Sequence, residues 1–201
     1  MTRSPLQRLL GRSAHSSATP RTRRHIAAAT LALALGGTSA VAAIVAVVPS
    51  VVLFVPTDVR VNQTQSNVRI IAFDEQQCIV LTADLHTDQA TIPKGTRVSC
   101  HFLHSDPVTT SLLNGQAQFN SNIVGVISSS AGLDASDRTC ERPGVIYPAP
   151  GTEPNRGLES FQPNDQYAII SPNVIQLQTD IPSFSDQVRV ITGCADIGGV
   201  P

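Results

Sequence analysis

The segment from Ile26 to Thr57 contains no charged side chain, although it follows an arginine-rich start and ends directly before Asp58. It has no polar stripe at helical spacing, so it is not an amphipathic helix that covers a soluble core. An apolar segment of this kind directs a chain into or across a membrane. The sequence therefore divides into an N-terminal targeting segment and a body that begins near Asp58.

The order of residues in the targeting segment is that of a secretory signal peptide. Residues 1–25 are basic, and the apolar segment that follows is broken after Leu35 by two glycines. Small side chains then occupy residues 40–43 (AVAA), which suits a signal peptidase. We predict cleavage near Ala42 or Ala43, which makes residues 1–43 a signal peptide.

Two features of the targeting segment leave the export route and the removal of the segment open. Residues 22–26 (TRRHI) resemble a twin-arginine export signal, so the export route is not fixed by the sequence. Apolar residues also resume after the break, and residues 26–48 are long enough to remain as a membrane anchor helix with the arginines inside. Residues 44–57 are then an apolar linker or a first strand. A cleaved signal peptide and a retained anchor helix both place residues 58–201 outside the cytoplasm.

The body of the protein is acidic. Without the six arginines that precede residue 25, 8 basic residues remain against 15 acidic ones, which gives a net charge of −7. Binding to nucleic acid requires Lys and Arg clustered on one face. We therefore expect no nucleic-acid partner.

All four cysteines belong to the body. An even number of cysteines in an exported chain favours two disulfides, because oxidising compartments preserve such bonds. The wide spacing differs from the close cysteine pairs of a zinc site. Four buried free thiols are the alternative. The residues are Cys78, Cys100, Cys140 and Cys194.

Short segments of alternating polarity, separated by turn residues, run through the body and predict strands. In residues 78–86, Ile79 and Leu81 fall on one face while Thr82 and Asp84 fall on the other. We predict an all-β fold, an antiparallel β-sandwich or jelly-roll-like single domain, preceded by the signal or anchor helix. Strands are predicted at residues 66–73, 78–86, 96–104, 115–119, 123–129, 145–147, 166–171, 174–179 and 187–192, with a single helical turn at 133–137.

The second and third predicted strands read as antiparallel neighbours. If their turn centres near Thr91, Cys78 lies opposite His104, and Cys100 lies about four residues away from Cys78. At roughly 3.3 Å per residue this gap exceeds the reach of a disulfide. The register therefore disfavours a bond between Cys78 and Cys100 and leaves the other pairings open.

Two groups of residues have side chains of the types that bind metals. His104 and Asp106 could share an ion at the end of a strand, but His101 would face the opposite side. A structural His104, hydrogen-bonded at the rim of the core, is the simpler interpretation. Asp134 and Asp137, joined by Asp106 or Glu159, offer oxygen ligands for Ca²⁺, although capping of a helical turn also explains Asp134. We expect no bound cofactor.

Hydrolytic chemistry has little support in the sequence. Residues 128–130 are three serines, but no Gly-x-Ser-x-Gly motif surrounds them. The spacing of the histidines does not suggest a triad. Sugar-binding sandwiches use exposed aromatic rings, and this chain has no Trp and only two Tyr. The sequence therefore predicts a protein that is not an enzyme.

Several blocks of the body occur together in a recognisable order. This order resembles a family of uncharacterised exported bacterial β-domains, over about residues 68–192. The resemblance implies export and a β fold, and it supplies no catalytic residue. The blocks are residues 101–107 (HFLHSDP), 125–129 (GVISS), 133–137 (LDASD), 144–148 (GVIYP), 156–159 (RGLE) and 187–192 (QVRVIT).

From these observations we predict a non-enzymatic structural or interaction module of the bacterial cell envelope or exterior. Its partner would be an unidentified protein or another component of the cell surface. The alternatives are a calcium- or glycan-binding adhesion domain and, third, a secreted hydrolase of unrecognised type. The predicted core comprises Ile70, Ile79, Leu81, Leu85, Val98, Phe102, Val126, Ile169, Leu177, Val188 and Val190.

Overall fold

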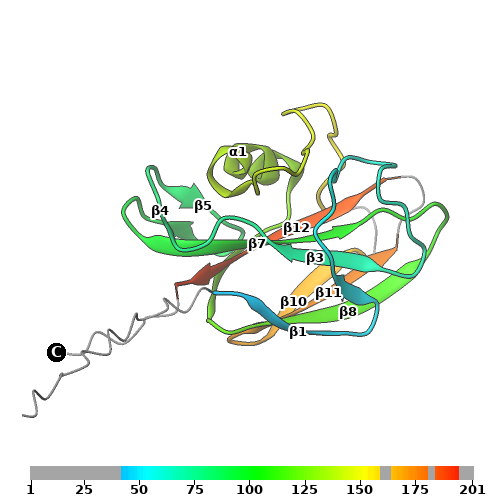
Figure 1. The fold of residues 1–201 in the computed structure, drawn as a ribbon, viewed down its shortest axis with the longest axis horizontal. Helices are drawn as coiled ribbons and strands as arrows, with labels where there is room; N and C mark the ends of the chain where they lie inside the picture. Colours follow the sequence, from blue (N-terminus) through cyan, green and yellow to red (C-terminus); the bar gives the residue numbers. More distant parts are fainter. Residues whose placement is uncertain (1–41, 159–163, 181–183, 195–201) are drawn as a thin grey trace, which may run out of the picture. The chain divides into compact units, whose positions relative to one another are not determined.

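The computed structural model describes residues 42–158, 164–180 and 184–194. The predicted leader up to residue 41 lies outside these residues, and so does Glu159. The described chain forms a β-sandwich with a third layer on one side (Figure 1). Sheet A is the lowest layer in Figure 1, sheet B is the middle layer, and the helix α1 (Ser130–Cys140) lies above sheet B.

Sheet A contains four strands, and every neighbouring pair is antiparallel. Alternation of side chains explains them: β8 buries every second residue from Leu113 to Phe119 and exposes amides between them. The sharp turn at Pro172 and Asn173 joins its last two strands, as predicted. In spatial order the strands are β1 (Ile44–Val48), β8 (Leu112–Phe119), β11 (Val174–Asp180) and β10 (Gln166–Ser171).

Sheet B is built around a long antiparallel pair, in which Asp186 to Gly193 lie opposite Ser105 to Val98. One pair in this sheet, β2 with β3, is parallel, whereas only antiparallel pairing was expected. The strand order is β2 (Val51–Leu53), β3 (Ile70–Asp74), β7 (Arg97–Ser105), β12 (Asp186–Gly193) and β9 (Ile123–Ile127), with β4 (Ile79–Val80) also paired to β7.

The predicted strand at residues 78–86 is interrupted. Only its ends are strands, β4 and β5 (Leu85–His86), and β5 pairs with β6 (Thr91–Ile92) instead of β7. Ile79 lies opposite Val98, so Cys78 is next to Ser99 and not opposite His104. The register assumed from the sequence was therefore wrong, because the turn lies closer to residue 88 than to Thr91.

Two disulfides connect the cysteines. Cys78 bonds Cys194 and Cys100 bonds Cys140, with Cα–Cα distances of 5.2 and 5.6 Å. The first bond attaches the end of β12 to the start of β4. The second attaches the end of α1 to β7, so it fastens the helical layer to sheet B.

The helix α1 is longer than the predicted turn at 133–137. Ser129 caps it, because its hydroxyl accepts a hydrogen bond of 3.2 Å from the amide of Gly132. Asp134 lies inside the helix and does not cap it, which corrects the expectation. Its polar neighbours Ser136 and Asp137 are buried against sheet B.

Sheet B is buried on both faces, because sheet A covers one face and α1 with the hairpin β5–β6 covers the other. Two apolar clusters result, one around Phe119 and Leu177 between the sheets and one around Phe102 and Leu133 under the helix. Most of the predicted core is buried. Ile79 is only partly buried, and Ile169, at 42% exposure, lies on an edge strand and is not core.

Residues 44–57, predicted as an apolar linker or first strand, form β1 and β2. The last five residues of the alternative anchor helix, Ile44–Val48, are thus a strand of sheet A. In the described part of the chain, no helix is long and apolar enough to cross a membrane.

Candidate functional site

A network of buried charges joins α1 to sheet B. The Arg189 guanidinium on β12 donates hydrogen bonds to both oxygens of Glu75 at 2.7 Å and to the Ser136 hydroxyl at 2.6 Å. It also lies 3.0 Å from Asp137 and 5.1 Å from the centre of the Phe102 ring. Burial opposes the charge of Arg189, but Glu75 and Asp137 outweigh it and raise its pKa.

A second buried arginine extends the network to the loop after α1. Arg156 contacts Asp134 at 2.9 Å and Asp137 at 2.8 Å, and its Nε donates to Gln187 at 2.8 Å. The two aspartates considered as Ca²⁺ ligands are therefore neighbours, and arginines neutralise their charge. This arrangement fixes the position of the helix.

The other metal-binding candidates lie at the end of β7. The Nε2 of His104 contacts the Thr64 hydroxyl at 2.6 Å, while Asp106 accepts hydrogen bonds from the amides of Asn62 and Thr64. Both side chains hold the same loop. Burial lowers the pKa of His104 to about 3, with a further contribution from Arg156, and burial raises the pKa of Asp106. Within the described residues, no three His, Cys, Asp or Glu side chains are grouped to hold a metal.

His101 takes part in an arrangement with the connectivity of a catalytic triad. Its Nδ1 contacts Asp74 at 2.7 Å and its Nε2 contacts the Thr192 hydroxyl at 2.9 Å. However, His101 and Thr192 are fully buried, and the ring of Phe119 packs on His101 at 4.7 Å. A substrate cannot reach this hydroxyl in the folded protein, so the geometry supports a structural link between β3, β7 and β12.

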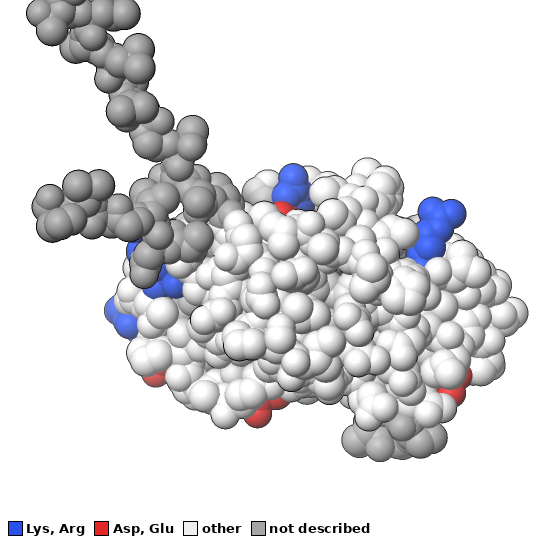
Figure 2. All heavy atoms as spheres, turned by 90° about the horizontal axis from the view of Figure 1, so that it is seen from below, with Lys and Arg blue, Asp and Glu red and all other residues white. Residues whose placement is uncertain are grey.

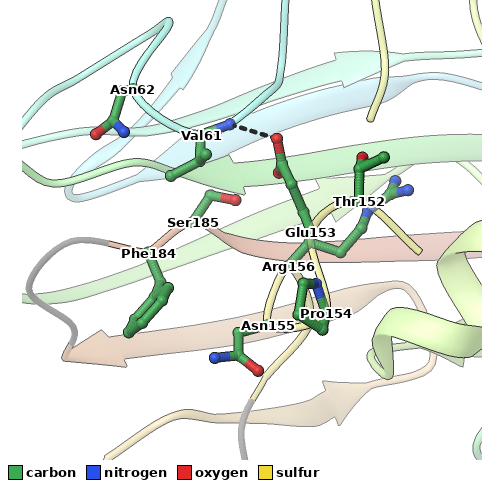
Figure 3. A pocket seen from close by; sticks show the side chains of 9 residues that line it. All are labelled: Val61, Asn62, Thr152, Glu153, Pro154, Asn155, Arg156, Phe184 and Ser185. Atoms are coloured by element: carbon green, nitrogen blue, oxygen red, sulfur yellow. Dashed lines mark hydrogen bonds between the residues drawn. The ribbon is translucent and has the colours of Figure 1, made fainter. Parts of the chain in front are cut away.

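A small hollow of about 190 Å³ lies between three loops (Figure 3). Phe184, Pro154 and Val61 form apolar parts of its wall. Glu153 accepts a hydrogen bond of 3.1 Å from the amide of Val61, drawn as the dashed line in Figure 3, and burial raises its pKa. Glu153 is the only acid among the lining residues. Glycoside hydrolysis in its usual form needs two carboxyl groups, so this hollow does not support it.

The outer face of sheet A carries amide side chains, and no charged side chain, over its middle. Gln116 on β8 lies opposite Gln176 on β11, which in turn lies opposite Ala168 on β10. In Figure 2, which views this side, the middle is white and charged side chains appear only towards its margins. Asp180 stands at the end of β11. The face carries six amide side chains, Asn114, Gln116, Gln118, Gln166, Gln176 and Gln178.

These amides are accessible. Asn114, Gln118 and Gln166 are exposed, and the others are half-buried by their neighbours. The Gln176 amide donates to the Asn114 oxygen at 2.9 Å, which orders side chains on adjacent strands. Each amide can both donate and accept hydrogen bonds. The face can therefore bind neutral polar groups without placing a charge in the interface.

Comparison of the chain with protein-family models, with curated proteins and with solved structures finds no match.

His104, Asp106, Asp134 and Asp137 were predicted from the sequence as possible site residues, but neither the amide face of sheet A nor the buried network around Arg189 was predicted. The alternation of Asn and Gln from Asn114 to Gln118 was available as a signal for the amide face. The partners of Arg189 were not, because Glu75 and Asp137 are brought to it from distant parts of the chain.

Proposed function

We propose that the protein is a non-enzymatic interaction module of the bacterial cell envelope or exterior, and that it binds its partner through the outer face of sheet A. The observation that carries this proposal is the absence of charge from the middle of that described face, in a body with a net charge of −7. Removing charged groups from water is costly, whereas an amide can exchange water for a partner's polar group.

Export is part of the same proposal. The order of basic, apolar and small residues up to residue 43 supports it, and the two disulfides are compatible with an oxidising compartment. The buried network around Arg189 stabilises sheet B, and sheet A, which carries the binding face, packs on sheet B. The resemblance to exported bacterial β-domains points in the same direction.

Binding of a neutral glycan is the second candidate function. Amide groups on adjacent strands, spaced about 4.8 Å apart, can hydrogen-bond the hydroxyls of an extended polysaccharide. The lack of an exposed aromatic platform weighs against this candidate relative to a protein partner. The calcium alternative loses support because Arg156 occupies the oxygens of Asp134 and Asp137.

The test is binding of the labelled protein to isolated bacterial envelopes and, separately, to an immobilised neutral glucan. The double variant Gln116→Glu with Gln118→Glu adds two charges at nearly constant shape. We expect its binding to the envelopes to fall at least tenfold. The control Gln63→Glu, in the loop before β3, should leave binding unchanged. Equal binding by both variants, or no binding to either probe, would overturn the proposal.

A further inference from the structure

The four outermost strands of the two sheets differ in length and in how far they are covered. On β9, the Asp88 amide donates to the Val126 carbonyl at 2.7 Å and the Val126 amide donates to the Gln89 side chain at 2.8 Å. The turn between β5 and β6 thus occupies the hydrogen-bonding groups of that edge. Strand β2 has three residues. Strand β1 has an irregular register after Ile44, which leaves three regular pairs, and β10 has one after Ile169, which leaves four.

Strand β10 is the longest of the four, and its residues 166–169 keep a regular register with β11. Among the described residues, β11 alone pairs with it, and its sequence from Gln166 to Ser171 (QYAIIS) has no charge and no proline. Ile169 and Ile170 are 42% and 49% exposed. Proteins usually blunt a free edge with lysine, proline or a covering segment, because it is a template for another strand.

The position of β10 is also fixed. The Tyr167 hydroxyl donates to Asp88 at 3.0 Å and accepts from Gln89 at 2.6 Å. The same turn that covers β9 therefore holds β10 in place. An ordered, uncovered edge loses little conformational freedom when another strand pairs with it.

We propose that two copies of the chain pair antiparallel through β10, across a two-fold axis. This pairing brings uncharged residues opposite uncharged residues, so the net charge of −7 opposes it less than it opposes contacts through acidic parts of the surface. A charged peptide would find no countercharge on β10. A two-fold contact closes on itself, so the product is a dimer with one continuous sheet. This inference does not depend on the partner of the outer face.

The experiment is sedimentation equilibrium of the protein recovered from outside the cytoplasm, over a range of concentrations. We expect a monomer–dimer equilibrium. Ile170→Lys, which places a charge on β10, should weaken the dimer at least tenfold, and the control Val80→Lys, on the exposed strand β4, should not change it. Equal thermal midpoints would show that both variants are folded.

A third variant separates an edge contact from a contact between faces. Gln116→Lys charges the outer face of sheet A and should leave the dimer intact. A monomer at all concentrations, a dimer that Ile170→Lys does not weaken, or a dimer that only Gln116→Lys abolishes would overturn the proposal. A series of larger species would do the same, because it would indicate an open head-to-tail contact.

Discussion

Arg189 and Glu75, which lie 114 residues apart in sequence, form two hydrogen bonds of 2.7 Å, and neither side chain is exposed to solvent. Ser136 and Asp137 of α1 bind the same guanidinium. The helix is therefore attached to sheet B through a charge as well as through Leu133 and the bond between Cys100 and Cys140.

Replacing Arg189 by Met should destabilise the protein by about 3–5 kcal/mol, because Glu75 would remain buried without its cation and Asp137 would keep only Arg156. The measurement is the free energy of unfolding from urea denaturation. Arg138→Met is the matched control, since Arg138 is exposed on α1, and its effect should stay within about 0.5 kcal/mol. Similar losses for the two variants would show that the network contributes little.

Removing either disulfide should lower stability. The chain-entropy model gives about 5 kcal/mol for Cys78–Cys194, which spans 116 residues, and about 4 kcal/mol for Cys100–Cys140, which spans 40. Guanidinium denaturation of the two double Cys→Ala variants measures these losses. Four thiols that react in the native, non-reduced protein would contradict the pairing.

His104 should make stability depend on pH. Burial lowers its pKa to about 3 from an ordinary value of 6.5, so between these values the unfolded chain binds a proton that the folded chain does not. Its contribution is complete above pH 6.5 and is lost as the pH falls, by about 1.4 kcal/mol per pH unit.

His104→Gln should remove this slope. The difference in unfolding free energy between the wild type and the variant is the quantity to follow from pH 7 to pH 4, because the contributions of other groups cancel in it. His86→Gln, on the exposed hairpin, is the control. Parallel curves for the wild type and His104→Gln would rule out a buried neutral His104.

Local sequence patterns predicted most strands well. Strands were predicted at residues 166–171 and 174–179, with a turn at Pro172 and Asn173 between them. The structure has β10 and β11 there. The β7 and β12 strands were also predicted within two residues. Such segments depend on nearest neighbours and turn chemistry, both of which are visible in the sequence.

The third layer was not predictable in this way. His101 and Arg189 lie in segments with the alternating pattern of half-buried strands. Both are buried, because sheet A covers His101 and α1 covers Arg189. Likewise, the buried side of α1 includes the polar residues Ser136 and Asp137, which contact Arg189. The helix therefore lacks the continuous apolar face that a sequence pattern would reveal. These contacts join segments tens of residues apart, so no local pattern reveals them.

The central claim is that an exported, oxidised body carries the binding face. The intact mass of the protein recovered from outside the cytoplasm tests this claim most directly, because it reports leader removal and disulfide formation together. We predict the mass of a chain that begins near residue 43 and has lost four hydrogens. A full-length chain with four free thiols, recovered folded from the cytosol, would contradict it.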